Sequence, residues 1–125
     1  MNKSIPLYYN EDKTAFGVLV SEGYGAGFST WGEREQAYDR RIIEFWLAHK
    51  DDSEWINELC NHYSNIPSAA ELEAKKFAES IGYEYVCWLG FEDCELYWVP
   101  VGKNFRIDEY DGAETLIIEG QEKWW

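Results

Sequence analysis

The chain has 125 residues, 46% of them hydrophobic and 18% aromatic, and a formal net charge of −13. This length predicts one domain, residues 1–125, with enough apolar side chains to form its own core. No apolar run approaches the roughly 20 residues of a membrane span, and the N-terminus lacks the pattern of a signal peptide. We therefore expect a cytoplasmic protein whose three cysteines are reduced thiols.

The negative charge is concentrated in the last three-fifths of the chain. Residues 1–50 carry seven acidic and six basic side chains, whereas residues 51–125 carry seventeen acidic and five basic ones. Such a distribution repels nucleic acids and anionic membranes and attracts basic protein surfaces. The alternative interpretation is that the charge only keeps an aromatic-rich protein soluble.

The first third of the chain predicts a β-hairpin followed by a helix. Residues 5–9, IPLYY, and 15–20, AFGVLV, have the composition of strands and are joined by the polar turn NEDKT. Further on, Thr30 and Glu33 have the spacing of a capping box. The apolar periodicity after this box predicts a helix that ends near Lys50.

Two more helices are predicted in the middle of the chain. The segment 51–63 has an apolar stripe at helical spacing, and Asp51 or Ser53 is its expected N-cap. The segment 67–81 has a capping box over Ser68–Glu71, and we expect it to end at the glycine that follows.

The last third of the chain has the pattern of short strands. The segments YEYVCWLG (83–90), ELYWVPV (95–101), FRIDEY (105–110) and TLIIEG (115–120) are aromatic or β-branched and are separated by turn residues. The whole order predicts an α+β domain with a largely antiparallel sheet. This sheet would consist of the N-terminal hairpin and a C-terminal meander, packed by about three helices.

Three glycines, Gly23, Gly25 and Gly27, stand between a predicted strand and a predicted helix, as they do in phosphate-binding loops. A P-loop needs Lys-Ser or Lys-Thr after its last glycine, and a dinucleotide fingerprint needs G-x-G-x-x-G with an immediate helix. The segment GYGAGFS has neither feature, and no basic residue lies between Val18 and Glu33. We interpret it as a turn that needs a positive φ or close backbone packing.

Candidate metal ligands have unsuitable spacings. Cys60 and His62 are two positions apart on a predicted helix, so their side chains point in different directions. Cys87 and Cys94 are further apart than the ligand pairs of structural zinc sites, and DEYDG (108–112) lacks the register of a calcium loop. We expect no metal, no cofactor and no catalytic residue, although the abundant carboxylates leave acid–base chemistry open as an alternative.

Two segments, AFGVLVSEGYGAGFSTW (15–31) and VPVGKNFRIDEYDGAETL (99–116), resemble motifs of a family of short proteins encoded in phage and prophage genomes. Phe28 stands where that family more often has tryptophan. The resemblance implies a small non-structural viral protein in the host cytoplasm and assigns it no activity. Small acidic phage proteins often inhibit host machinery, as anti-CRISPR and anti-restriction proteins do.

The leading hypothesis is a non-enzymatic inhibitor of a host nucleic-acid-handling complex. It would bind a host protein with a basic nucleic-acid-binding surface through an acidic, DNA-mimic-like surface, without binding nucleic acid or membrane itself. The candidate carboxylates are Asp51, Asp52, Glu54 and Glu58 at a helix start, Glu92, Asp93 and Glu95 in one turn, and Asp108, Glu109 and Asp111 in a later turn. The last two clusters would form one acidic face if the sheet brings both turns to one edge.

Two alternatives belong to other classes of protein. One is an interaction or accessory domain that uses exposed aromatic side chains, with Trp124 and Trp125 as candidates. The other is a small enzyme that depends on carboxylates. The oligomeric state and the identity of the partner stay open.

Overall fold

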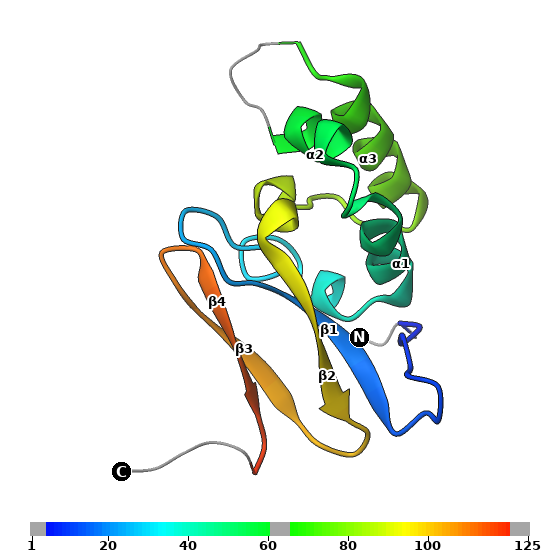
Figure 1. Ribbon diagram of the computed structural model, residues 1–125, viewed down its shortest axis with the longest axis vertical. Helices are drawn as coiled ribbons and strands as arrows, with labels where there is room; N and C mark the ends of the chain where they lie inside the picture. The colour runs from blue at the N-terminus through cyan, green and yellow to red at the C-terminus, as the bar shows by residue number, and fades with distance from the viewer. Residues whose placement is uncertain (1–4, 61–65, 121–125) are drawn as a thin grey trace.

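Three α-helices lie on one side of two β-ribbons in the computed structural model, which describes residues 5–60 and 66–120 (Figure 1). The helices are α1 (Arg40–His49), α2 (Ser53–Cys60) and α3 (Ala69–Ser80), with two 3-10 helices, η1 (Arg34–Ala37) and η2 (Trp88–Asp93). The strands are β1 (Ala15–Ser21), β2 (Cys94–Pro100), β3 (Phe105–Tyr110) and β4 (Ala113–Ile118). The predicted α+β class is confirmed. In the described part of the chain, no helix combines the length and apolar character needed to cross a membrane.

The four strands pair as two separate antiparallel ribbons. β1 pairs with β2 in a register that runs from Ala15 opposite Pro100 to Ser21 opposite Cys94. β3 and β4 form a local hairpin. The expected C-terminal meander is therefore wrong. β2 pairs with β1, which precedes the helices in the sequence, and not with β3. A buried strand needs hydrogen-bonding partners along its whole length, and β2 supplies them to β1.

The expected first strand, over residues 5–9, does not form. The segment makes only two isolated bridges, one to Asp39 and one to Phe16. Pro6 has no N–H to donate to a ladder, and its carbonyl oxygen instead accepts a 2.8 Å hydrogen bond from the backbone N–H of Arg40. The segment thus links β1 to the start of α1 rather than widening a sheet.

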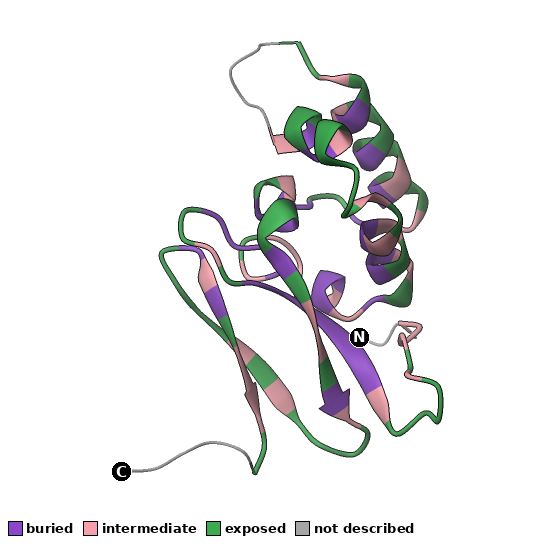
Figure 2. Ribbon diagram, in the orientation of Figure 1, coloured by how far each residue is buried: buried purple, intermediate pink, exposed green. Residues whose placement is uncertain are grey.

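β1 is buried on both faces (Figure 2). Leu19 belongs to a core that it shares with Ile42 of α1 and Phe91 of η2. Val18 and Val20 belong to a second core, against which apolar side chains of β3 and β4 pack. β1 therefore lies between the helices and the β3–β4 hairpin, which explains its continuous run of apolar residues.

The first helix starts later than expected because its predicted cap is used elsewhere. The hydroxyl and the N–H of Thr30 donate to Glu114 of β4, at 2.5 and 3.1 Å, so no capping box forms there. α1 begins at Arg40 instead, and the Asp39 carboxylate caps it by accepting a 2.9 Å hydrogen bond from the N–H of Arg41.

The other two helices begin close to where the sequence predicts. α2 is capped by Asp52, whose carboxylate accepts a 3.1 Å hydrogen bond from the N–H of Trp55, rather than by Asp51 or Ser53. The capping box before α3 is confirmed, with reciprocal bonds between Ser68 and Glu71.

The strand expected over residues 83–90 is wrong. Its first half is irregular, and Trp88 begins the 3-10 helix η2. Residues three positions apart lie on the same side of a 3-10 helix, so Trp88 and Phe91 both reach Phe45 of α1, with ring centroids 5.9 and 6.1 Å away. Burial of two aromatic rings on one side outweighs the strand propensity of this segment.

Candidate functional site

The glycine segment binds a carboxylate of the protein itself. Glu114, only 3% exposed, points from β4 into the loop. Its Oε1 accepts a hydrogen bond from the N–H of Ser21 at 2.9 Å, and its Oε2 accepts one from the N–H of Phe28 at 2.8 Å, besides the two from Thr30. Gly25 supplies the turn with a φ of 102°. The backbone N–H groups that could make an anion-binding loop are thus occupied by an internal anion.

The same loop joins the two acidic turns at the end of the β-ribbons that is nearer to the helices (Figure 1). The N–H of Glu22 donates to the carbonyl of Asp93 at 3.3 Å, and the N–H of Gly25 donates to the carbonyl of Asp111 at 2.7 Å. The Asp93 carboxylate lies directly against Gly23, where a β-carbon would come within 2.5 Å of it. Asp93 and Asp111, from turns that are distant in the sequence, are therefore held beside one loop.

Asp51 is close to the first of these turns. A concavity of about 180 Å³ is lined by Asp51, Glu92 and Glu95, together with Lys50 of the exposed 3.3 Å Lys50–Asp51 ion pair. The structure thus places one residue of the helix-start cluster beside the turn after η2. We call the exposed carboxylates around the glycine loop and this concavity the acidic face: Glu22, Asp51, Glu92, Asp93, Glu95 and Asp111.

Besides Asp51 in its ion pair with Lys50, three more of the predicted carboxylates are engaged within the protein. Asp52 caps α2. Asp108 accepts a 3.0 Å hydrogen bond from Arg106 Nε in an exposed ion pair. Glu109 Oε2 accepts hydrogen bonds from the indole Nε1 of Trp31 at 3.2 Å and from the N–H of the glycine at position 112 at 2.8 Å. Their hydrogen-bonding capacity is partly used by the fold.

The remaining candidates lie away from the acidic face or outside the described residues. Glu54 and Glu58 are exposed on α2, one helical turn apart. Trp124, Trp125 and His62 lie outside the described residues.

The cysteines are free thiols, with Cys87 and Cys94 buried and Cys60 partly exposed. Burial raises the pKa of Cys60 to about 11 and that of Cys94 well above its ordinary value. A protonated thiol is a poor nucleophile and metal ligand. Across residues 5–60 and 66–120, no three histidine, cysteine or acidic side chains are arranged to hold a metal ion.

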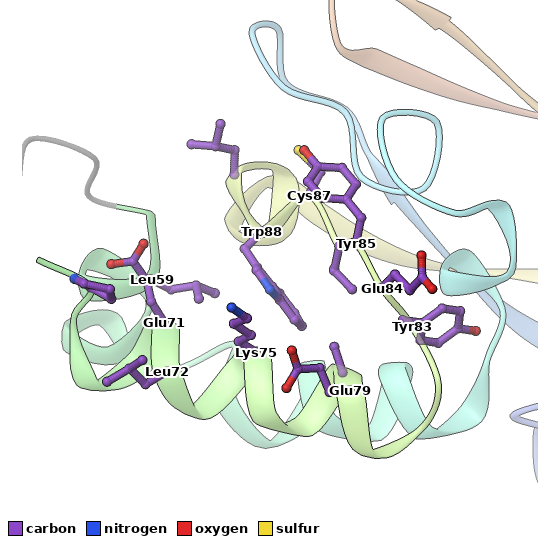
Figure 3. Close-up of a pocket in the computed structure, with 14 residues that line it drawn as sticks. Leu59, Glu71, Leu72, Lys75, Glu79, Tyr83, Glu84, Tyr85, Cys87 and Trp88 are labelled. Carbon is purple, nitrogen blue, oxygen red and sulfur yellow. The ribbon is translucent and has the colours of Figure 1, made fainter. Parts of the chain in front are cut away.

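A groove of about 510 Å³ separates α3 from the segment 83–89 (Figure 3). Trp88 lies in the middle, with its ring directed toward α3. Leu72, Tyr85 and Leu89 also line the groove and are 52%, 59% and 40% exposed. The volume falls in the range of protein binding pockets, and the lining is mostly apolar.

Charged side chains lie along the edges of this groove. Glu71, Lys75 and Glu79 come from α3, and Glu84 comes from the opposite wall. Figure 3 shows Glu79 and Glu84 toward the end of the groove where Tyr83 lies. Three carboxylates and one ammonium group give the groove a net negative rim.

A charge pair between buried Asp39 and half-buried Arg41 fixes the Tyr83 end of the groove. The Tyr83 hydroxyl donates to Asp39 Oδ2 at 2.8 Å, and Arg41 donates to both Asp39 oxygens at 2.9 and 2.6 Å. Burial works to raise the pKa of Asp39, but the hydrogen bonds from Arg41 and Tyr83 hold it below its ordinary value. Burial and the bond to Asp39 raise the pKa of Tyr83. The trio is therefore a fixed structural contact at neutral pH.

Sequence reasoning missed both Glu114 and the groove. The sequence does contain a signal for Glu114, because it lies on the same face of β4 as Leu116 and Ile118, which pack against the second core. A glutamate on the apolar face of a strand indicates a buried carboxylate. The groove left no such signal, since Leu72 and Trp88 have the pattern of ordinary helix and strand residues.

Comparison of the chain with models of known families, with curated proteins and with solved structures gives no match. The resemblance to phage-encoded proteins stays a prediction that rests on two sequence segments. The surfaces described above are therefore the basis for a functional assignment.

Proposed function

We propose that this protein binds the basic, nucleic-acid-binding surface of another protein through the acidic face. The observation that carries the proposal is the position of the glycine loop. Its backbone binds the turns of Asp93 and Asp111 on its two sides, and Asp51 lies beside the first turn. Exposed carboxylates from three separate parts of the sequence therefore lie around this loop and the concavity beside it.

The acidic face is attached to backbone that is held in place. The carbonyls of Asp93 and Asp111 accept hydrogen bonds from the loop, and buried Glu114 anchors the loop to β4. A fixed array of carboxylates loses little conformational freedom when it meets a partner. It can pair with the lysines and arginines that otherwise contact phosphates, and it releases their counterions as DNA does.

The phage setting comes from the sequence resemblance. With that setting, the partner is a subunit of a host nucleic-acid-handling complex, of the kind that anti-CRISPR or anti-restriction proteins inhibit, in the cytoplasm of the host cell. The inhibition is competitive, because the acidic face and the nucleic acid occupy the same basic surface. Neither nucleic acid nor an anionic membrane is a direct ligand of a face with this charge.

The test is capture of partners by the tagged protein in a phage-susceptible bacterium, with washes at low and high salt. We expect to capture a protein that has a basic nucleic-acid-binding surface. This protein should be released at high salt and displaced by duplex DNA or by RNA. The variant Glu92→Lys/Glu95→Lys should lose this partner. The control variant Glu11→Lys/Glu44→Lys has the same change in net charge at exposed positions outside the acidic face and should retain it.

A partner that survives high salt and the Glu92→Lys/Glu95→Lys change would contradict the proposal. Retention of that partner would instead favour recognition through apolar side chains, because exposed charge pairs weaken steeply with salt and buried apolar contacts do not.

A further inference from the structure

The groove between α3 and residues 83–89 exposes apolar side chains that the rest of the described fold does not cover. Leu72, Tyr85 and Leu89 are each at least 40% exposed, and they line the groove together with Trp88. The Trp88 ring is fixed from behind by Phe91, with the two rings edge to face and their centroids 5.1 Å apart. A rigid aromatic ring flanked by exposed apolar residues is typical of a binding hot spot.

The backbone of the groove wall excludes a strand as occupant. The N–H groups of Glu84 and Tyr85 already donate to Glu33 Oε2, at 3.1 and 3.4 Å. The carbonyl of Tyr85 accepts a 2.5 Å hydrogen bond from Gln36 Nε2. Strand addition needs free backbone groups along an edge, and these three are in use. An α-helix satisfies its own backbone and needs only an apolar surface.

The length and the charge of the groove define the helix that fits it. Lining residues of α3 run from Glu71 to Glu79, which corresponds to about 12 Å or two helical turns. Glu79 and Glu84 lie toward the same end (Figure 3). A helix N-terminus or a basic side chain is favoured at such an end, and the single Lys75 does not balance the three carboxylates.

We propose that this groove binds an amphipathic helix of the protein's partner, with apolar residues at i, i+3 or i+4 and i+7 packed on Leu72, Trp88 and Leu89 and with basic residues facing Glu79 and Glu84. The basic character of the partner rests on the proposed function. The groove adds apolar contacts to those of the acidic face, which stays the main, salt-dependent contact with the partner, and both surfaces are lined in part by α2 and η2.

A synthetic probe tests this without knowledge of the partner. The probe is a helical peptide of leucine, alanine and lysine, with leucines at i, i+3, i+4 and i+7. Two control peptides have the same composition with the leucines scrambled, or glutamate in place of lysine. NMR titration of the labelled full chain should give saturable shifts at the Trp88 indole and at Leu72 and Leu89, and the scrambled peptide should give none there.

Protein variants then assign the contacts. Leu72→Ser/Leu89→Ser removes two exposed groove residues and should weaken the lysine peptide about tenfold or more. Val101→Ser, at a 53% exposed position outside the groove, should leave its affinity unchanged. Glu79→Lys/Glu84→Lys should weaken the lysine peptide and strengthen the glutamate peptide.

Several results would overturn the proposal. These are shifts confined to the acidic face around Gly25, absence of saturable shifts at Trp88, equal binding of the scrambled peptide, or no effect of Leu72→Ser/Leu89→Ser. The outcome is independent of the acidic face, because Glu92→Lys/Glu95→Lys should leave groove shifts in place. Failure of one proposal is therefore distinguishable from failure of the other.

Discussion

Glu114 Oε2 lies 2.8 Å from the backbone nitrogen of Phe28, so a carboxylate on β4 holds a loop that is distant from it in the sequence. The same carboxylate also binds the backbone of Ser21 and Thr30. Through Ser21 of β1, this carboxylate links the β3–β4 hairpin to the β1–β2 ribbon. It also sets the position of the loop on which the acidic face depends.

Replacement of Glu114 should destabilise the fold and loosen this loop. Glu114→Ala leaves the buried N–H groups of Ser21 and Phe28 and the half-buried N–H of Thr30 without an acceptor, and it should lower the free energy of unfolding by about 3–5 kcal/mol. Glu114→Gln keeps one acceptor and should cost about half as much. Chemical denaturation measures both, and hydrogen exchange should show faster exchange at the Phe28 and Thr30 amides. Unchanged protection of these amides in the alanine variant would contradict the role of Glu114.

Gly90 should tolerate no side chain, because η2 meets the glycine loop backbone to backbone. A β-carbon at position 90 would overlap the carbonyl group of Gly27 and lie 3.1 Å from the nitrogen of Phe28. Gly90→Ala should therefore lower the free energy of unfolding by about 1–3 kcal/mol and shift the Phe28 amide resonance. Gly102→Ala, in open space at a φ of 92°, is a control that should perturb only its own turn. An unshifted Phe28 resonance in Gly90→Ala would contradict the close approach.

Asp39 should make the protein sensitive to acid. Its pKa in the fold is below the ordinary 3.8, because the bonds from Arg41 and Tyr83 outweigh the effect of burial. As the pH falls, Asp39 therefore takes up its proton at a higher pH in the unfolded chain than in the folded protein. The stability that Asp39 contributes is complete above pH 3.8 and is lost as the pH falls through the lower pKa of the folded state. Asp39→Asn should remove this part of the pH dependence.

The measurement is the free energy of unfolding from pH 7 to pH 2.5 for the parent, Asp39→Asn and Tyr83→Phe. We expect Asp39→Asn to cost about 1–3 kcal/mol at pH 7 and to show a shallower acid slope. Tyr83→Phe should lose one hydrogen bond and keep most of the slope, since Arg41 still pairs with Asp39. Parallel curves for the parent and Asp39→Asn would show that this carboxylate does not titrate as described.

Thiol chemistry should be slow in the folded protein. The pKa of Cys60 is raised to about 11 from an ordinary 9.0, chiefly by burial, which lowers its thiolate fraction at pH 8 about a hundredfold. Cys94 is more deeply buried and should react more slowly still. Alkylation followed by mass spectrometry should modify Cys60 before Cys94, and denaturant should equalise them. Rapid native labelling of Cys94 would contradict its burial.

The elements that the sequence predicts correctly are those stabilised by local interactions. The capping box at Ser68 and Glu71 uses neighbouring residues, and α3 forms where it predicts. The apolar composition of residues 15–20 predicts a strand, and β1 forms there, with Val18 and Leu19 in separate cores. In such places, a few adjacent residues carry enough information to define the structure.

The elements that differ are those decided by distant contacts. Thr30 has the spacing of a helix cap, but Glu114 accepts both of its hydrogen bonds. Trp88 and Phe91 stand in a strand-like run, but their rings pack around Phe45. The acidic face is of the same kind, since no local pattern reveals that the turns of Asp93 and Asp111 meet one loop. Such pairings depend on tertiary packing that spacing along the chain does not encode.

The pairing of β1 with β2 also has a consequence for how the chain is made. β1 leaves the ribosome before the helices and well before β2, yet six of its seven residues are buried in the finished fold. Until β2 is synthesised, this apolar strand has an open edge, which is a site for aggregation. The helices can form from local contacts in the meantime, and they cover only one face of β1. Expression at low temperature or with a chaperone that binds extended apolar segments should therefore raise the soluble yield.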